Sequence, residues 1–220
     1  MRCAPCPPDL PPLTPCALQQ HPRYASSLST MGGKAHRLAL IDADQIIGQA
    51  QITTRRVGPF HLNWLPRGPV WAPNTDTSQR RAAVNALHAG CRGLWLANPD
   101  NQSDATLLRA IGYRALFTPQ HVAELDLTKP ESMRLAAQNG KWRNRLRRAL
   151  DHATYGALKI THRAYDPARD ALLLEQEHAQ RRARRYAALP QAFTRAWRRQ
   201  AARLPAFIWP GIAARPWHSC

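Results

Sequence analysis

The segment 65–71 (LPRGPVW) presents one arginine between residues that restrict the backbone. A proline fixes its own φ angle and lacks a backbone N–H, and a glycine lets another part of the chain approach closely. Arg67 lies between Pro66 and Gly68-Pro69, so its guanidinium is presented in one direction. Such a guanidinium suits bidentate binding of a phosphate or carboxylate. The alternative is a turn at a strand end, with Arg67 directed at water.

A second segment, 141–149 (KWRNRLRRA), combines cations with apolar residues at helical spacing. On a helix, Trp142, Leu146 and Ala149 share one face, and the cations cover the rest. A solvated basic face is the ordinary interpretation. Like charges four residues apart repel each other, and an anionic partner would relieve that repulsion. The substrate-binding candidates in this segment are Trp142, Arg143 and Asn144.

A third basic segment, 181–186 (RRARRY), contains a single aromatic residue, Tyr186. Single-stranded nucleic acid is usually bound on a succession of aromatic side chains, which this segment lacks. No zinc-finger, RRM or P-loop pattern occurs elsewhere in the chain. A lone basic cluster of this kind is weak evidence for a nucleic-acid partner.

The sequence offers no clear nucleophile or metal site. There is no GxSxG motif, and Cys91 and the nine histidines have no partner at catalytic or metal spacing. Cys3 and Cys6 form a CxxC pair, but zinc needs two more ligands, and Cys16 and His21 lie on a segment broken by prolines. We expect reduced thiols without a metal, and we assign no catalytic residue.

The net charge of +17 is concentrated in the last part of the chain. Residues 1–130 carry a net charge of +5, and residues 131–220 carry +12. Such a field attracts nucleic acid, nucleotide phosphates or anionic lipid surfaces. Arginine greatly outnumbers lysine, which a GC-rich genome would explain as well as phosphate recognition would. The apolar fraction of 44% is that of a globular domain.

The chain has no apolar run of the roughly 20 residues that a membrane-spanning helix needs. Its first 16 residues are rich in proline and make a poor signal peptide. We therefore expect a cytoplasmic protein.

Hydrophobic periodicity and turn residues predict a mixed order of helices and strands. The predicted helices are 17–31, 77–89, 103–111, 130–152, 166–189 and 193–204, with Thr77 or Ser78 capping the second and Thr128 capping the fourth. The predicted strands are 36–42, 46–53, 61–65, 94–97, 113–118, 122–127 and 158–164. No regular element is expected in 1–16 or 205–220. An early hairpin among mixed elements favours a layered α/β (α+β) fold over an alternating parallel sheet.

Several segments, in this order, resemble the FemAB-like family of acyltransferases, relatives of the GNAT superfamily. The two specific ones are 66–71 (PRGPVW) and 141–149 (KWRNRLRRA). The weaker ones are 18–24 (LQQHPRY), 48–51 (GQAQ), 98–99 (NP), 111–113 (IGY) and 124–127 (ELDL). The resemblance covers roughly residues 17–200.

The resemblance implies two GNAT-like lobes. Residues 1–16 would form a proline-rich arm, 17–152 the first lobe, 153–204 the start of a second lobe and 205–220 an irregular tail. The strand pair that should follow residue 204 is absent, so we expect a reading frame that ends early or shifts near Phe207. Whether such a chain is active stays open.

Family members move an acyl or aminoacyl group from acyl-CoA or aminoacyl-tRNA to an amine, in the known branch an amine of a peptidoglycan precursor. The resemblance implies these substrates here, with no tightly bound cofactor and no covalent enzyme intermediate. It also places an acceptor-binding arginine and aromatic residue at Arg181 or Arg182 with Tyr186. The alternatives are a basic nucleic-acid-binding protein and an inactive truncated remnant.

Overall fold

The computed structural model describes residues 1–118, 125–155, 165–185 and 189–203. The chain divides into two compact units. The first joins Met1–Leu116 with Leu172–Pro205, and the described part of the second lies within Phe117–Ala171. The sequence-based boundary near residue 152 between two lobes stays a prediction.

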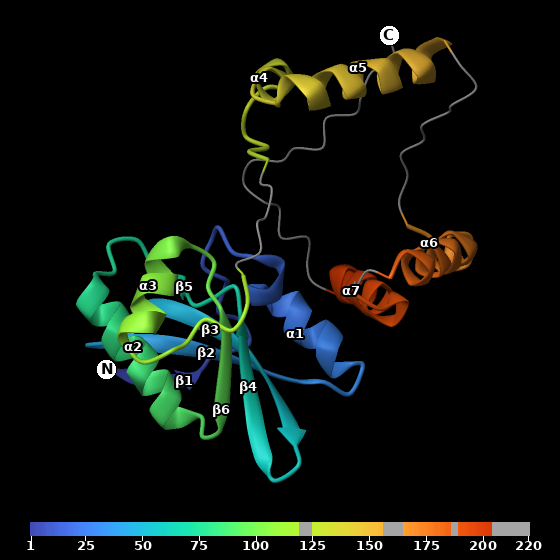
Figure 1. Ribbon diagram of the computed structural model, residues 1–220. Coiled ribbons are helices and arrows are strands. Elements are labelled where there is room, and N and C mark those ends of the chain that lie inside the picture. The colour runs from blue at the N-terminus through green and yellow to red at the C-terminus, as the bar shows by residue number, and fades with distance from the viewer. Residues whose placement is uncertain (119–124, 156–164, 186–188, 204–220) are drawn as a thin grey trace. The chain divides into compact units, whose positions relative to one another are not determined.

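A six-stranded mixed sheet forms the centre of the first unit (Figure 1). The strands follow the order β1-β2-β3-β4-β6, and β5 pairs with β3 beside this path. All pairs are antiparallel except β4 with β6. The strands are β1 Arg2–Pro5, β2 Lys34–Asp42, β3 Gln45–Val57, β4 Phe60–Pro66, β5 Val70–Trp71 and β6 Leu94–Asn98. This mixed sheet confirms the predicted α/β layered class.

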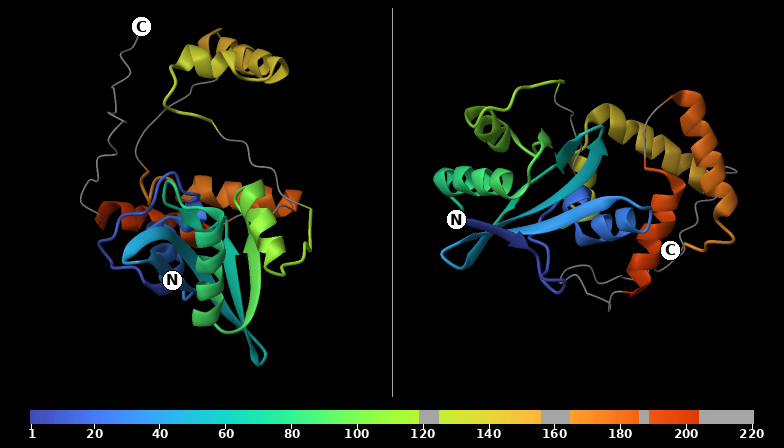
Figure 2. Two further views of the ribbon diagram at one scale, coloured as in Figure 1. Left: turned by 90° about the vertical axis from the view of Figure 1, so that its left-hand side faces the viewer. Right: turned by 90° about the horizontal axis from the view of Figure 1, so that it is seen from below.

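Helices cover both faces of this sheet. In the views of Figure 2, α2 and α3 lie on one face, and α1 and α7 lie on the other. The helices of the first unit are η1 Leu18–Gln20, α1 Pro22–Ser29, α2 Thr77–Gly90, α3 Gln102–Ala110, α6 Ala171–Arg184 and α7 Gln191–Arg203. Among the residues described, no helix is both long enough and apolar enough to cross a membrane.

The main core lies between the sheet and α2. Leu40, Ile52 and Leu65 from the strands and Leu87 from α2 are fully buried there. On the opposite face, Tyr24 of α1 packs against Phe193 of α7, with 5.0 Å between ring centroids. Burial of large apolar side chains on both faces is what holds the layers together.

The predicted hairpin is present as β2 and β3, and both strands are longer than expected. Two residues, Ala43 and Asp44, make the turn between Asp42 and Gln45, and both have positive φ angles. A two-residue turn with two positive φ angles suits the right-handed twist of the paired strands.

Three terminal or capping predictions are wrong. Residues 2–5 form β1 along β2, because the edge of β2 offers unpaired backbone groups to the arm that we expected to be irregular. The cap of α2 is Asp76, which exchanges hydrogen bonds with Gln79 in a capping box, and not Thr77 or Ser78. Pro130, and not Thr128, precedes α4.

The predicted strand 113–118 does not form. The ring of Tyr113 packs against His88 of α2 instead, and its hydroxyl lies 2.7 Å from His88 Nε2. The last three residues of the predicted strand 122–127 also form no strand, and its first three lie outside the described residues, as does 158–164.

In the second unit, the single helix predicted over 130–152 is divided into α4 Glu131–Ala136 and α5 Gly140–Tyr155. The side chain of Asn139 accepts a hydrogen bond from the backbone N–H of Lys141 at 3.0 Å. Asparagine is favoured immediately before a helix because its side chain accepts from a free backbone N–H, so Asn139 begins α5, while α4 has already ended at Ala136.

Candidate functional site

Arg67 lies at the carboxyl end of β4, beside the carboxyl end of the parallel strand β6. Its backbone N–H donates to the carbonyl of Asn98 at 2.6 Å, and its Nε lies 2.6 Å from Asp100 Oδ1. Its φ of 50° is a left-handed conformation. Loops at the carboxyl ends of parallel strands are where open α/β sheets commonly bind ligands. Arg67 is therefore held in one direction as predicted, but toward a carboxylate of the same chain.

The proline-containing segment leaves a gap in the sheet, and Gln20 fills it. Gln51 pairs with Arg37 of β2 on one side. On its other side it lies between the stretches of β3 that pair with β4 and β5, and it has no strand partner there. Its N–H donates to Gln20 Oε1 at 2.8 Å, and Gln20 Nε2 donates to the carbonyls of Gln51 and Pro66. A Cβ at Gly68 would lie 2.6 Å from the Gln20 side chain, so glycine is required by this close approach.

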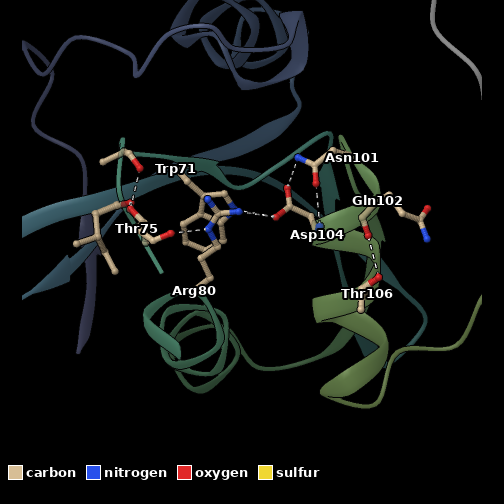
Figure 3. Close-up of polar contacts among 9 residues, drawn as sticks. Trp71, Thr75, Arg80, Asn101, Gln102, Asp104 and Thr106 are labelled. Atoms are coloured by element: carbon tan, nitrogen blue, oxygen red, sulfur yellow. Dashed lines mark hydrogen bonds and ion pairs between the residues drawn. The ribbon is translucent and has the colours of Figure 1, made fainter. Parts of the chain in front are cut away.

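A buried carboxylate, Asp104, connects three segments near the chain that links β4 to β5 (Figure 3). Trp71 Nε1 donates to Asp104 Oδ1 at 2.9 Å, and Asn101 Nδ2 donates to Oδ2 at 2.9 Å. Arg80 Nη1 lies 3.7 Å from Oδ1, and its guanidinium lies 5.5 Å from the centre of the Trp71 ring. Asp104 thereby joins β5, α2 and the start of α3.

The environment of Asp104 acts on its pKa in both directions. Burial raises the pKa, while the hydrogen bonds from Trp71 and Asn101 and the charge of Arg80 lower it, and the net direction is upward. Only 2% of Asp104 is exposed, so the loss of hydration is the larger effect.

The two arginines and two carboxylates balance each other in charge. Arg67 and Arg80 keep 20% and 26% of their side chains exposed, whereas Asp104 is closed off. An anionic ligand that reaches Arg67 therefore competes with Asp100 for the guanidinium. Asp104 contacts both Arg80 and Trp71 and so fixes their positions.

The residues predicted on the second basic segment lie on α5, in the other unit. Trp142 and Asn144 are exposed, and Arg143 is half-buried, donating from Nη1 to the carbonyl of Ala136 at 3.1 Å. The Arg145 guanidinium lies 5.6 Å from the centre of the Trp142 ring.

The third basic segment lies on α6, and its two candidate arginines differ. Arg181 is buried, pairs with Glu177 at 2.6 Å and donates to the carbonyl of Leu189 at 2.8 Å. Arg182 is exposed, and Tyr186 lies outside the described residues. Arg181 also borders a cavity of about 460 Å³ between α6 and α7, lined by Leu174, Glu177, Arg181, Leu189, Gln191 and Thr194.

The four cysteines among the described residues, Cys3, Cys6, Cys16 and Cys91, all have thiol pKa values raised by burial. Burial, with the neighbouring Cys91 and Cys6, raises the pKa of Cys3 to about 11, and burial also raises the pKa of Cys91. Thiols with raised pKa values stay protonated at neutral pH, and the thiolate is the reactive form. Among the residues described, no three His, Cys, Asp or Glu side chains are grouped to hold a metal ion.

No protein-family model and no curated protein matches the chain. Among solved structures, FemX superposes with a TM-score of 0.57 and 17% sequence identity over 82% of this chain. The chain has a FemX-like fold. It spans about half the length of FemX, 48% of that chain. A probable acetyltransferase covers 42% of this chain and 69% of its own length at 14% identity, but its TM-score of 0.31 is too low to support a fold assignment.

The FemX-like fold agrees with the resemblance found in the sequence, and at this identity it establishes the fold alone. Sequence reasoning missed Arg80, Asp100 and Asp104 at the candidate site. One signal could have identified Asp100 and Asp104. Both follow the predicted strand 94–97, which lies parallel to β4, the strand that ends just before Arg67. Carboxyl ends of adjacent parallel strands meet at one edge of a sheet.

Proposed function

We propose that this chain is part of an acyl- or aminoacyltransferase that uses acyl-CoA or aminoacyl-tRNA as donor and an amine as acceptor. The observation that carries the proposal is the FemX-like fold over 82% of the chain. The acceptor amine of a peptidoglycan precursor fits the same proposal. All these substrates except a free amine are polyanions, in keeping with the net charge of +17.

The reaction needs no enzyme nucleophile. The amine nitrogen forms a C–N bond to the donor carbonyl, and the C–S bond of a thioester or the C–O bond of an ester breaks. The amine loses one proton, and the thiolate or alkoxide that leaves takes one up. The protein contributes by holding the two reactants together and stabilising the oxyanion that forms.

The proposed substrate-binding residues are the cations and aromatic residues identified from the sequence. Arg67 and Arg182 of the first unit and Arg143 of the second would each bind donor or acceptor phosphates. The further proposed substrate-binding residues are Trp142, Asn144 and Tyr186. Arg181 supports this role less directly, because Glu177 and the Leu189 carbonyl already occupy its guanidinium.

Binding and transfer are measured separately with isotope-labelled acyl-CoA and aminoacyl-tRNA. We expect saturable binding of one donor, competition by the same unlabelled donor, and a labelled amide once an amine is added. Arg182→Gln should weaken donor or acceptor binding by about tenfold. Arg81→Gln, which removes an exposed arginine of α2, is the matched control.

Two results would contradict transfer. The first is that the chain binds tRNA, unrelated RNA and duplex DNA with the same salt dependence and forms no product. This result would indicate a nucleic-acid-binding protein. A folded chain that binds neither donor and forms no product would be an inactive remnant.

A further inference from the structure

Helix α5 carries an exposed apolar stripe. Trp142, Leu146 and Leu150 follow each other at four-residue spacing, and 65%, 43% and 44% of their surfaces are exposed. Residues four apart lie on the same side of a helix. None of the side chains from Lys141 to Asp151 is buried.

The rest of α5 is strongly cationic. Five cations and one acid, Asp151, give the helix a net charge of +4. Arg145 flanks the stripe from one side, with its guanidinium over the Trp142 ring. The cations are Lys141, Arg143, Arg145, Arg147 and Arg148.

Among the described residues of its own unit, the stripe has no buried apolar side chain beside it. Every buried apolar residue of the described chain belongs to the first unit. In the second unit, Phe117 and Met133 are exposed as well. An amphipathic helix without a core to cover needs another apolar phase or partner.

We propose that α5 binds to the surface of an anionic phospholipid bilayer. The apolar stripe would enter the boundary between headgroups and acyl chains, and the flanking cations would contact lipid phosphates. A helix with an apolar face, a Trp and a lysine- and arginine-rich polar face is the type that lies in this interface. Each basic residue near an anionic leaflet adds to the attraction. This inference shares Trp142 and Arg143 with the proposed substrate-binding residues, and its test measures vesicle binding in the absence of any transferase substrate.

The charge and the stripe together favour a bilayer over two other occupants. A nucleic acid would contact the cations but leave Leu146 and Leu150 in water, and Trp142 alone offers no succession of stacking platforms. A second copy of α5 on the same stripe would bring two helices of charge +4 together.

The test is co-sedimentation of the full chain with vesicles of phosphatidylcholine, with and without about 30% phosphatidylglycerol. We expect binding to the anionic vesicles only. Leu146→Ser/Leu150→Ser and Arg147→Gln/Arg148→Gln should each weaken it by about tenfold. Arg55→Gln/Arg56→Gln, which removes two exposed cations of β3, is the charge-matched control and should change binding by less than about twofold.

Tryptophan quenching by brominated lipids tests insertion in the unaltered stripe. We expect quenching on anionic vesicles, reduced in Trp142→Phe. Equal vesicle binding by Leu146→Ser/Leu150→Ser and wild type would overturn the proposal, as would quenching unchanged in Trp142→Phe. Two further results would overturn the proposal. In the first, RNA at equal phosphate concentration displaces the vesicles, and Leu146→Ser/Leu150→Ser binds RNA and vesicles as well as the wild type does. In the second, the chain without lipid is a dimer, and Leu146→Ser/Leu150→Ser is a monomer.

Discussion

At the scale of single residues, Asp104 is the group whose chemistry the fold changes most directly. Its carboxylate is buried yet receives hydrogen bonds from Trp71 and Asn101. A carboxyl whose pKa is higher in the folded than in the unfolded chain binds more protons when folded. Its contribution to the free energy of unfolding therefore decreases as pH rises from 3.8 through the raised pKa.

Asp104→Asn should consequently cost most stability at low pH. At low pH, Asp104 of the wild type is protonated, so no buried charge reduces the stability of the wild type. The variant still loses some of the hydrogen bonds that Asp104 makes, which should lower its free energy of unfolding by about 1–3 kcal/mol. The difference between wild type and variant should shrink as pH rises above 3.8. Urea denaturation between about pH 3 and pH 7 measures it.

Asp44→Asn, at the exposed turn between β2 and β3, is the control for loss of one negative charge. A difference that grows with rising pH would mean that the donors around Asp104 stabilise its charge more than burial destabilises it.

At the scale of elements, the side-chain amide of Gln20 makes the hydrogen bonds to the edge of β3 that a neighbouring strand would otherwise make. Gln20→Ala would leave the N–H and carbonyl of Gln51 and the carbonyl of Pro66 without their partner in a buried site. Unpartnered buried backbone groups are costly, so we expect the free energy of unfolding to fall by about 2–4 kcal/mol. Chemical denaturation followed by circular dichroism measures the change.

The neighbouring Gln19→Ala is a matched control, because Gln19 Oε1 has no hydrogen-bond partner in the structure. We expect this variant to lose less than about 1 kcal/mol. Equal losses at the two positions would mean that Gln20 contributes packing rather than hydrogen bonds.

Gln20 also shows where sequence reasoning succeeds and where it stops. The hairpin of β2 and β3, strand β4 and helices α3 and α7 could be predicted, because periodicity and turn residues are local signals. The contact of Gln20 with Gln51 joins residues 31 apart, and no local pattern encodes it. Strand β1 depends likewise on an available edge of β2, and Asp104 on the crossover that places β6 beside β4.

At the scale of the whole molecule, the two units differ in how their apolar side chains are used. The first unit buries its large apolar residues on both sides of a sheet, whereas the described part of the second exposes them. Global stability should therefore come from the first unit. Local opening of α5 should need less free energy than opening of β3.

Paired truncations of a leucine in each unit test this difference. Leu40→Ala removes a side chain with 0% exposure and should cost about 2–5 kcal/mol, whereas Leu146→Ala on α5 should stay within about 0.5 kcal/mol. Urea denaturation gives both values, and hydrogen exchange should show α5 amides exchanging before those of β3 in the wild type. If Leu146→Ala cost as much as Leu40→Ala, the stripe would already be covered in solution by protein. A neutral Leu146→Ala leaves the stripe free to enter a bilayer, because a side chain cannot be buried in the protein and inserted in lipid at once.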